Sequence, residues 1–440
     1  MDTLKLKDIL KNAGVAGAGG AGFPAYGKVT DKADTLILNC AECEPLLKLH
    51  RLLLENEADK ILKALSAVRE TIGAKEFVVA VKGSYTGAVN AVKKALSGYP
   101  DGRLHILREV YPSGDEVILV YDVTGKIVPA GGIPISVGCV VHNVETMYNI
   151  YRAIFEGAPV THKFVTVAGE VKNPGTFYAP IGTSFSDLIA LAGGKTAEKT
   201  EIISGGPMTG MLSNESACVT KTTNAILVMP EDHNIIRRRK ENVTLSVKRA
   251  MSVCCQCRTC TDLCPRHLLG QPIDPAAFMR CIASGDANVK PLYNALYCAS
   301  CGVCQMYSCP HSLSPSALLG IYKGKLRKNG LKPEPVESKG ADPDREYKLV
   351  PMARLVSRLN VGEYNVPAPL YGGEVKPSLL KIKTSQSIGA PSVPVVKAGD
   401  SVKKGDLIAA AKENALSLPI HSPVDGVVDS ADEKMIVIKQ

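Results

Sequence analysis

Two runs of cysteines constrain this chain more than any other feature of its sequence. They read Cys254-x2-Cys257-x2-Cys260-x3-Cys264-Pro265 and Cys298-x2-Cys301-x2-Cys304-x4-Cys309-Pro310. The short spacings let three thiolates of a run curl around one face of a four-iron, four-sulfur cube, while the fourth, before proline, reaches the neighbouring cube. We therefore expect two [4Fe–4S] clusters. One should bind Cys254, Cys257, Cys260 and Cys309, and the other Cys298, Cys301, Cys304 and Cys264.

Structural zinc is the alternative metal for such spacings, because it also favours Cys-x2-Cys pairs. Zinc takes four ligands as two separated pairs, however, and not as two triplets each followed by Cys-Pro. Cys255 adjoins a predicted ligand and could replace Cys254. The remaining cysteines are expected to be small buried hydrophobic residues: Cys40, Cys43, Cys139, Cys218 and Cys281.

The composition of the chain favours a cytoplasmic, multidomain protein. Its 440 residues predict two to four domains. No apolar segment approaches the roughly 20 residues that span a bilayer, and the chain does not open on a secretory signal. In a reducing compartment, cysteines crowded between 254 and 309 indicate metal binding rather than disulfides. The dense basic run Arg237-Arg238-Arg239-Lys240 is expected to be a solvated linker or helix face, so nucleic acid is not an expected partner.

The pattern of apolar residues divides the chain into α/β and α+β units. Over 1–158, expected helices at 3–12, 46–71 and 87–96 alternate with expected strands at 35–38, 76–82, 104–107 and 117–121, which predicts an α/β domain. A strand at 164–171 and a helix at 185–192 predict a small α+β unit over 159–235. The cysteines dominate a helical module over 243–330, and a linker over 332–346 leads to a region, 347–440, that ends in a small β-structure.

A glycine-rich loop near the start of the chain is a candidate phosphate site. It reads Gly17-Ala18-Gly19-Gly20-Ala21-Gly22-Phe23-Pro24. Glycines let the backbone approach a phosphate closely and direct N–H groups at it. The loop is not the dinucleotide-binding fingerprint, because it does not run from a strand into a helix.

Four motifs in order resemble the flavin mononucleotide (FMN) domain of the complex I NADH-binding subunit, and still more its relative, the RnfC subunit of the Rnf electron-transport complex. They are Gly19 to Pro24, Asn39-Cys40-Ala41-Glu42-Cys43-Glu44-Pro45, Tyr111-Pro112-Ser113-Gly114-Asp115-Glu116 and Val141-His142-Asn143-Val144-Glu145-Thr146. Residues 166–194 resemble the soluble-ligand-binding β-grasp (SLBB) module of the same group. The cysteine module is similar to a bacterial two-cluster ferredoxin.

The resemblance to the FMN domain implies a role for individual residues. The backbone of Gly17, Gly19, Gly20 and Gly22 and the side chain of Lys28 would surround the FMN phosphate. The ribityl chain and flavin ring would be lined by Asn39, Glu42, Tyr111, Gly114, Glu116 and Asn143, and NADH would stack near Phe23 and Glu44. No separate catalytic side chain is expected. Ala16 and Ala18 stand where the complex I subunit has arginines, and Ala41 where it has aspartate, so backbone N–H groups must hold the phosphate.

The end of the chain resembles a lipoyl-type barrel-sandwich over 395–408 and 420–428, without a carrier lysine at the expected tip, 414–418. We expect a docking module rather than a swinging arm. RnfC-type subunits usually carry this module first, whereas here it comes last, an order similar to that of the cobalamin reductases of propanediol-utilization microcompartments.

The second resemblance implies an NADH-dependent oxidoreductase that passes electrons through FMN and the clusters to cob(III)alamin and cob(II)alamin. FMN accepts two electrons together, whereas each cluster carries one. The expected partners are NADH, cobalamin or a cobalamin-handling enzyme, and shell or redox proteins of a microcompartment. Two alternatives stay open. One is an electron-wiring or scaffold protein with a degenerate flavin site, and the other is an RnfC-like NADH:ferredoxin oxidoreductase subunit.

Overall fold

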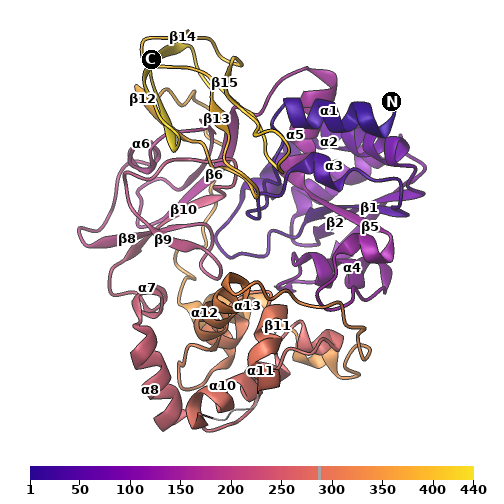
Figure 1. Cartoon of the computed structure of the whole chain (residues 1–440), viewed down its shortest axis with the longest axis vertical. Helices are drawn as coiled ribbons and strands as arrows, with labels where there is room; N and C mark the ends of the chain where they lie inside the picture. The colour runs from indigo at the N-terminus through magenta and orange to yellow at the C-terminus, as the bar shows by residue number, and fades with distance from the viewer. Residues whose placement is uncertain (286–288) are drawn as a thin grey trace.

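The computed structural model describes residues 1–285 and 289–440. Figure 1 shows the α/β domain at the upper right, the helical cysteine module below, and the β-rich units at the upper left. The C-terminal β-structure lies above the β-grasp unit, and both ends of the chain lie in the upper part of the view, the C-terminus at the left and the N-terminus at the right.

The N-terminal domain is built on a parallel sheet of four strands in the order β3-β2-β1-β5. The strands are β1 (Thr35–Cys40), β2 (Glu76–Lys82), β3 (Gly102–Leu107) and β5 (Cys139–Asn143). Near-continuous apolar runs such as that of β2 are expected where both faces of a parallel sheet are covered. The helices and 3₁₀ turns of this domain are α1 (Thr3–Asn12), η1 (Ala25–Lys28), α2 (Leu49–Ile72), α3 (Thr86–Leu96), α4 (Glu116–Thr124), η2 (Pro134–Val137) and α5 (Val144–Phe155).

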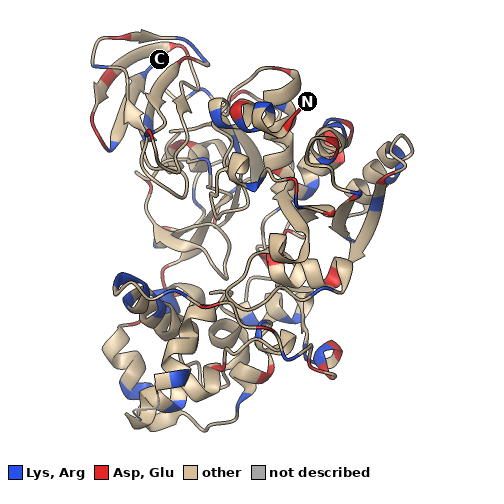
Figure 2. Cartoon of the chain, turned by 45° about the vertical axis from the view of Figure 1, so that its right-hand side comes forward, with Lys and Arg blue, Asp and Glu red and all other residues tan. Residues whose placement is uncertain are grey.

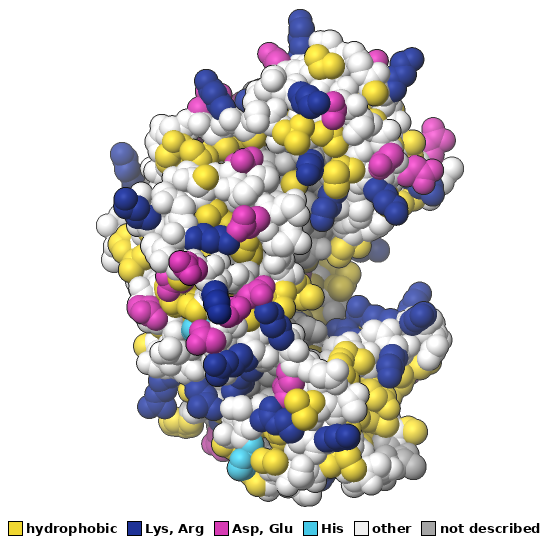
Figure 3. Space-filling view, turned by 90° about the vertical axis from the view of Figure 1, so that its left-hand side faces the viewer, with side chains coloured by type: hydrophobic (Ala, Val, Ile, Leu, Met, Phe, Trp, Pro, Cys, Tyr) yellow, Lys and Arg dark blue, Asp and Glu magenta, His cyan; other side chains and the backbone are white. Residues whose placement is uncertain are grey.

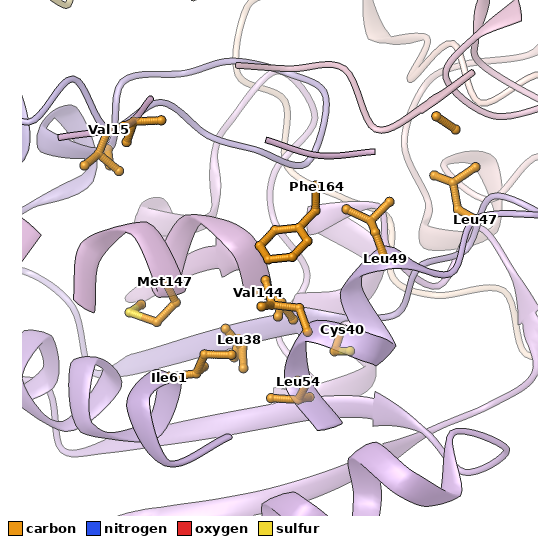
Figure 4. Close-up of a cluster of buried hydrophobic side chains, with 14 of the residues drawn as sticks. Val15, Leu38, Cys40, Leu47, Leu49, Leu54, Ile61, Val144, Met147 and Phe164 are labelled. Carbon is orange, nitrogen blue, oxygen red and sulfur yellow. The ribbon is translucent and has the colours of Figure 1, made fainter. Parts of the chain in front are cut away.

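Alternate residues of the central strand belong to two different cores. Leu36 and Leu38 pack with α2, α3 and α5, whereas Ile37 packs with α4 on the opposite face. Figure 4 shows Leu38 and Ile61 lying toward Val144 and Met147 of α5, with Phe164 of the next unit above them. The α/β domain and the β-grasp unit therefore share one hydrophobic core.

One expected element of this domain was wrong. Residues 117–121, predicted as a strand, lie in the helix α4. The Asp115 side chain accepts hydrogen bonds from the N–H groups of Val117 and Ile118, and Gly125 ends the helix in the left-handed conformation. Because α4 is buried nearly all round, its sequence lacks the polar face that would mark a helix.

The β-grasp unit has a five-stranded sheet in the order β7-β6-β10-β8-β9, with β6 and β10 parallel. Its elements are β6 (His162–Gly169), β7 (Gly175–Pro180), α6 (Phe185–Leu191), β8 (Thr200–Ser204), β9 (Met211–Ser213) and β10 (Ala225–Pro230). The side chain of Ser184 caps α6, whose apolar face packs on the sheet.

Short helices form the cysteine module and carry the two cysteine runs between them. They are α7 (Asn234–Lys240), α8 (Val243–Val253), α9 (Thr259–Asp262), η3 (His267–Leu269), α10 (Pro275–Ser284), α11 (Val289–Tyr293), η4 (Asn294–Tyr297), the π-turn η5 (Cys304–Ser308) and α12 (Pro315–Lys328). The expected linker returns to the α/β domain, where Val336 bridges Ala130. It continues into η6 (Arg345–Lys348), β11 (Val350–Pro351), which pairs with β4 (Val110–Tyr111), and α13 (Met352–Leu359).

The C-terminal unit consists of two small sheets, β12-β18-β17-β14 and β13-β15-β16. Their strands are β12 (Leu379–Lys383), β13 (Val393–Pro394), β14 (Ser401–Val402), β15 (Leu407–Ala410), β16 (Ile420–His421), β17 (Gly426–Ala431) and β18 (Met435–Lys439). The tip predicted to lack a carrier lysine packs on the α/β domain, because the Tyr26 hydroxyl lies 3.4 Å from both the N–H and the carbonyl of Ser417. The tip is therefore fixed in contact with the α/β domain.

Candidate cluster and flavin sites

The eight predicted cluster ligands line two separate pockets, four cysteines to each. One pocket is lined by Cys254, Cys257, Cys260 and Cys309, with Cys255 also on its wall. A second pocket is lined by Cys264, Cys298, Cys301 and Cys304. Cys264 and Cys309 thus each cross to the pocket of the other run, which is the exchange that the Cys-Pro positions predict. We call the first set the distal cysteines and the second the proximal cysteines.

The two runs bring their thiols together by the same turn of the backbone. The residues on either side of the second cysteine of each run have positive φ: Gln256 (57°) and Arg258 (63°) in one, Ser300 (57°) and Gly302 (79°) in the other. Left-handed residues curl the chain tightly. Successive side chains can therefore face one pocket.

Burial gives the thiols around the two pockets different acidities. It raises the pKa of Cys260 and of Cys264 to about 12, and that of Cys301 well above the ordinary thiol value. Exposed Cys257 is the opposite case, since the hydroxyl and N–H of Thr259 lower its pKa. Buried thiols of this kind become thiolates only when a metal replaces their protons.

The number of thiols at each pocket matches the ligand set of an iron–sulfur cube. Each pocket is lined by four of the eight predicted cysteines. A [4Fe–4S] cluster takes four thiolates, which these cysteines would supply.

The glycine-rich loop is closed on itself and packed against the start of α5. Gly17 N–H donates to the carbonyl of Phe23 (2.8 Å), and Gly22 N–H to that of Gly17 (3.2 Å). An added Cβ on Gly19 would lie 3.4 Å from the side chain of Asn143, an ordinary contact distance, whereas Gly20 has a φ of 108°. Backbone conformation therefore favours glycine at position 20.

Lys28 and Glu116, which were predicted to contact different parts of FMN, form an ion pair with each other. Lys28 Nζ is 2.8 Å from Glu116 Oε1 and donates to the carbonyl of Val141 (2.9 Å). Both side chains are partly exposed. Lys28 is thus held at the carboxyl end of β5, and the positive charge predicted for the phosphate is balanced by Glu116 in this structure.

Asn39, Gly114 and Asn143 organise the loops at the end of the sheet. Asn39 Nδ2 donates to the carbonyl of Gly114 (2.9 Å), and its Oδ1 accepts from Ala41 N–H (3.1 Å). Asn143 caps α5, since its Oδ1 accepts from Glu145 N–H. Their side chains therefore fix the backbone at the carboxyl ends of β1 and β5, where α/β sheets bind ligands.

Glu42 is fully buried and faces protein groups. Its carboxylate accepts from the N–H of His50 (2.8 Å) and from Arg51 Nε (2.6 Å), at the start of α2. Burial opposes its ionisation, but the Arg51 guanidinium and His50 outweigh burial and lower the pKa of the Glu42 carboxyl. His50 and Arg51 did not emerge from sequence reasoning. A His-Arg pair in the first turn of a helix just after Glu44-Pro45 was the available signal.

His50 carries a buried nitrogen without a protein partner in the described part of the chain. Its Nε2 makes no hydrogen bond, while Nδ1 lies 3.4 Å from Asn143 Nδ2. Burial lowers the pKa of His50 to about 4, so the ring is neutral at physiological pH. A neutral ring with one open nitrogen beside Asn143 fits a site that receives a polar ligand.

The two residues predicted to stack with NADH are engaged elsewhere. The Glu44 carboxylate accepts from the N–H groups of Met208 and Thr209 (both 2.8 Å) and from the Thr209 hydroxyl (2.5 Å). It thereby holds the turn between β8 and β9 of the β-grasp unit. Phe23 is half-buried, and its ring packs against Gly27.

Tyr111 reaches from the α/β domain to the cysteine module. Its hydroxyl donates to the carbonyl of Cys301 (2.7 Å), and burial raises its pKa well above the ordinary value. The side chain predicted at the flavin is therefore also in contact with the second cysteine run.

The basic run in α7 was expected to be solvated, and this was wrong for two of its residues. Arg238 donates to the carbonyl of Gln305 and to the hydroxyl of Ser312. Arg239 donates to the carbonyls of Gly210 (3.0 Å) and Pro207 (2.7 Å). Figure 2 shows this run as the dense blue helix where the β-grasp unit meets the cysteine module. The arginines join these two units.

None of the helices in the described residues is long and apolar enough to cross a membrane.

Family profiles match four successive parts of the chain. They are the Nuo51 FMN-binding domain at residues 10–152, the SLBB domain at 164–212, the 4Fe-4S dicluster domain at 253–314 and the RnfC barrel sandwich hybrid domain at 374–439. Cobalamin reductase PduS of Citrobacter freundii is 38% identical over 99% of this chain and 97% of its own length. The chain belongs to the PduS family. PduS of Salmonella typhimurium is 39% identical over 99% of this chain and 96% of its own length.

A more distant relative shares only part of the chain. One subunit of the Na(+)-translocating ferredoxin:NAD(+) oxidoreductase complex of Acetobacterium woodii is 34% identical over 63% of this chain and 61% of its own length. PduS membership and the matched domains confirm the multidomain fold and an electron-transfer oxidoreductase. Its cofactors are FMN and [4Fe–4S] clusters.

Proposed function

We propose that this chain takes electrons from NADH and delivers them, through FMN and two [4Fe–4S] clusters, to cob(III)alamin and cob(II)alamin. The match to two relatives named cobalamin reductase, over nearly the whole length of both, supports this acceptor. The observation that carries electron transfer is the pair of four-cysteine pockets on the same chain as an FMN-binding domain. Bound FMN would convert a two-electron donation into single-electron transfers, which are all that a cluster accepts.

The chain's own residues divide this work. The distal and proximal cysteines would each bind one cluster. The backbone of Gly17, Gly19, Gly20 and Gly22, with Lys28, would hold the FMN phosphate, and Asn39, Tyr111, Gly114, Glu116 and Asn143 would surround the rest of the cofactor. Glu42 would support the residues around the cofactor indirectly, because its carboxylate already binds Arg51 and the His50 N–H group. NADH would approach near Phe23, with Glu44 shaping that side through the turn it holds.

The domains and the setting are part of the same proposal. An FMN and NADH domain over 1–158, an SLBB unit over 159–235, a two-cluster module over 243–330 and a C-terminal region over 347–440 would work together inside a propanediol-utilization microcompartment. Shell proteins or a cobalamin-handling enzyme would be the partners. Co-purification of the tagged chain with shell proteins, against a variant without residues 374–440, would test the setting.

An anaerobic cofactor and turnover measurement tests the function. The purified chain is analysed for iron, sulfide and released flavin, then mixed with NADH and with cob(III)alamin. We expect about eight irons per chain, FMN that bleaches on NADH, and reduction of the corrinoid. A chain that contains eight irons but binds no flavin and does not respond to NADH would contradict this function and support the electron-wiring alternative. Reduction of ferredoxin but not of the corrinoid would favour the RnfC-like alternative.

A further inference from the structure

The loop from Tyr111 to Glu116 connects the candidate flavin site to one of the two cysteine pockets. We propose that electrons enter the cysteine module at the proximal cysteines and leave it from the distal cysteines, and that Tyr111 and Arg266 position the proximal pocket against the flavin domain. This order rests on the proposed function, because it assumes that FMN binds at the carboxyl end of the sheet. Neither the family nor the domain matches assign an order to the clusters.

Two hydrogen bonds fasten the proximal pocket to the loop. The Tyr111 hydroxyl donates to the carbonyl of Cys301 (2.7 Å), and the Tyr111 side chain is only 4% exposed. Arg266 Nη2 lies 2.8 Å from Asp115 Oδ2, with both side chains largely buried. Cys301 is a proximal cysteine, and Arg266 follows the proximal Cys264 by two residues.

The same loop carries groups that the FMN-domain resemblance places at the flavin. Gly114 and Glu116 flank Asp115, the residue that binds Arg266. Gly114 also accepts from Asn39 Nδ2. One short stretch of backbone therefore contacts the proximal pocket on one side and the candidate flavin site on the other.

The β-grasp unit closes this junction from a third direction. An added Cβ on Gly302 would lie 3.1 Å from the carbonyl oxygen of Met208. Met208 sits in the turn that the Glu44 carboxylate holds. The backbone beside Cys301 is thus fixed by Tyr111 on one side and by the β-grasp turn on the other.

The distal pocket differs from the proximal one in its exposure. The lining residues of both pockets lie within the cysteine module, between 254 and 315 for the distal pocket and between 264 and 319 for the proximal one. Cys255, Cys257 and Arg258 on its wall are exposed. Figure 3 shows hydrophobic side chains gathered on the lower, helical part of the molecule, with Lys and Arg side chains just above them. The exposed side chains of α8, including Leu245 (51%) and Met251 (62%), lead up to the distal Cys254.

This asymmetry favours one direction of transfer. The rate of single-electron transfer falls steeply with distance, so a cluster held by the proximal cysteines, which are tied to the flavin domain, would take each electron first. It would pass that electron to a cluster held by the distal cysteines, from whose exposed side the acceptor would be reduced. Two such transfers would carry the two electrons of one NADH.

Removing one cluster at a time tests the order. In Cys298→Ala/Cys301→Ala the proximal cluster is absent, and in Cys257→Ala/Cys260→Ala the distal one. Bound flavin is reduced by a light flash with a sacrificial donor, so that NADH binding is not involved, and freeze-quenched EPR follows the remaining cluster. We expect the variant without the distal cluster to keep the fast reduction phase, and the variant without the proximal cluster to lose it.

The experiment needs separate controls for folding and for function. Iron content and circular dichroism verify that each double variant keeps one cluster and its fold. Tyr111→Phe keeps all eight cysteines and is expected to slow the fast phase severalfold. Tyr293→Phe, which removes a hydroxyl bound to the carbonyl of Lys332, should leave it unchanged. A fast phase that survives without the proximal cluster would overturn the order alone. A chain that retains clusters but no flavin would overturn the proposed function as well.

Discussion

Lys221 is a fully buried cation without a carboxylate partner among the described residues. Its Nζ donates to the carbonyls of Gly14 (2.8 Å) and Pro419 (2.9 Å), so a β-grasp lysine joins the glycine-rich end of the α/β domain to the C-terminal unit. Burial lowers its pKa from 10.5 to about 7. The neutral amine still donates both hydrogen bonds, and only the charged form is penalised.

Because of this lowered pKa, the free energy of unfolding should rise with pH. Below about pH 7, Lys221 is charged in both states and the burial penalty is complete. Between about 7 and 10.5 the unfolded chain binds more protons, so the free energy of unfolding rises by up to about 1.4 kcal/mol per pH unit. Denaturation midpoints at pH 7 and pH 9 should differ more in the wild type than in Lys221→Met. If the denaturation midpoint changes by the same amount between pH 7 and pH 9 in both proteins, burial does not lower the pKa of Lys221 in the folded state.

Glu44 offers a direct choice between two roles. If its carboxylate holds the β8–β9 turn, Glu44→Gln places an amide N–H against the donors of Met208 and Thr209. The free energy of unfolding should then fall by about 1–3 kcal/mol, with little change in the KM for NADH. Glu231→Gln, at an exposed carboxylate, is the matched control. A higher KM with unchanged stability would restore the NADH-stacking role.

At the scale of elements, α4 is the one whose type was predicted wrongly from the sequence. Val117 to Tyr121 is a short apolar run, and such a run fits a buried strand or a buried helix equally well. Its caps, Asp115 and Gly125, were the signals that decide for a helix. The other three helices and three strands predicted for the α/β domain were found within a few residues of their expected ends. Strand β5 and helix α5, by contrast, were not predicted.

Asp115 has two roles that can be separated. It caps α4, and it pairs with Arg266 of the cysteine module. Asp115→Ala should lower the free energy of unfolding by about 1–2 kcal/mol through loss of the cap. Asp115→Asn should retain the cap and lose only the ion pair, so thermal denaturation should place it between Ala and wild type. If the free energy of unfolding falls equally in both variants, the ion pair with Arg266 contributes more to stability than the helix cap.

The interleaved cysteines were predictable because their spacing alone fixes which thiols can meet. The roles of Glu42, Arg238 and Arg239 were not, because their partners come from other elements or from distant parts of the chain. Arg238, for example, binds Gln305 and Ser312 of the second cysteine run. Sequence position therefore showed that a side chain was charged but not what it would bind.

At the scale of the whole molecule, the two pockets predict a simple stoichiometry. Cys257→Ala should lower the iron content from about eight to about four per chain, because it removes a ligand of the distal cluster only. Cys281→Ala, at a buried cysteine outside both pockets, should keep about eight. Iron and sulfide analysis of the anaerobic proteins gives the answer. Cys255→Ala should also keep both clusters, and an iron loss there would identify Cys255 as a ligand in place of Cys254.

The glycine-rich loop is completed by a residue made late in synthesis. The carbonyl of Gly22 accepts a hydrogen bond from Ile388 N–H (2.9 Å), and the backbone of Ser387 lies against Gly22. The glycine-rich loop therefore gains this contact only after residue 388 has been synthesised, when both cysteine runs are already part of the chain. A chain truncated before residue 387 would lack it.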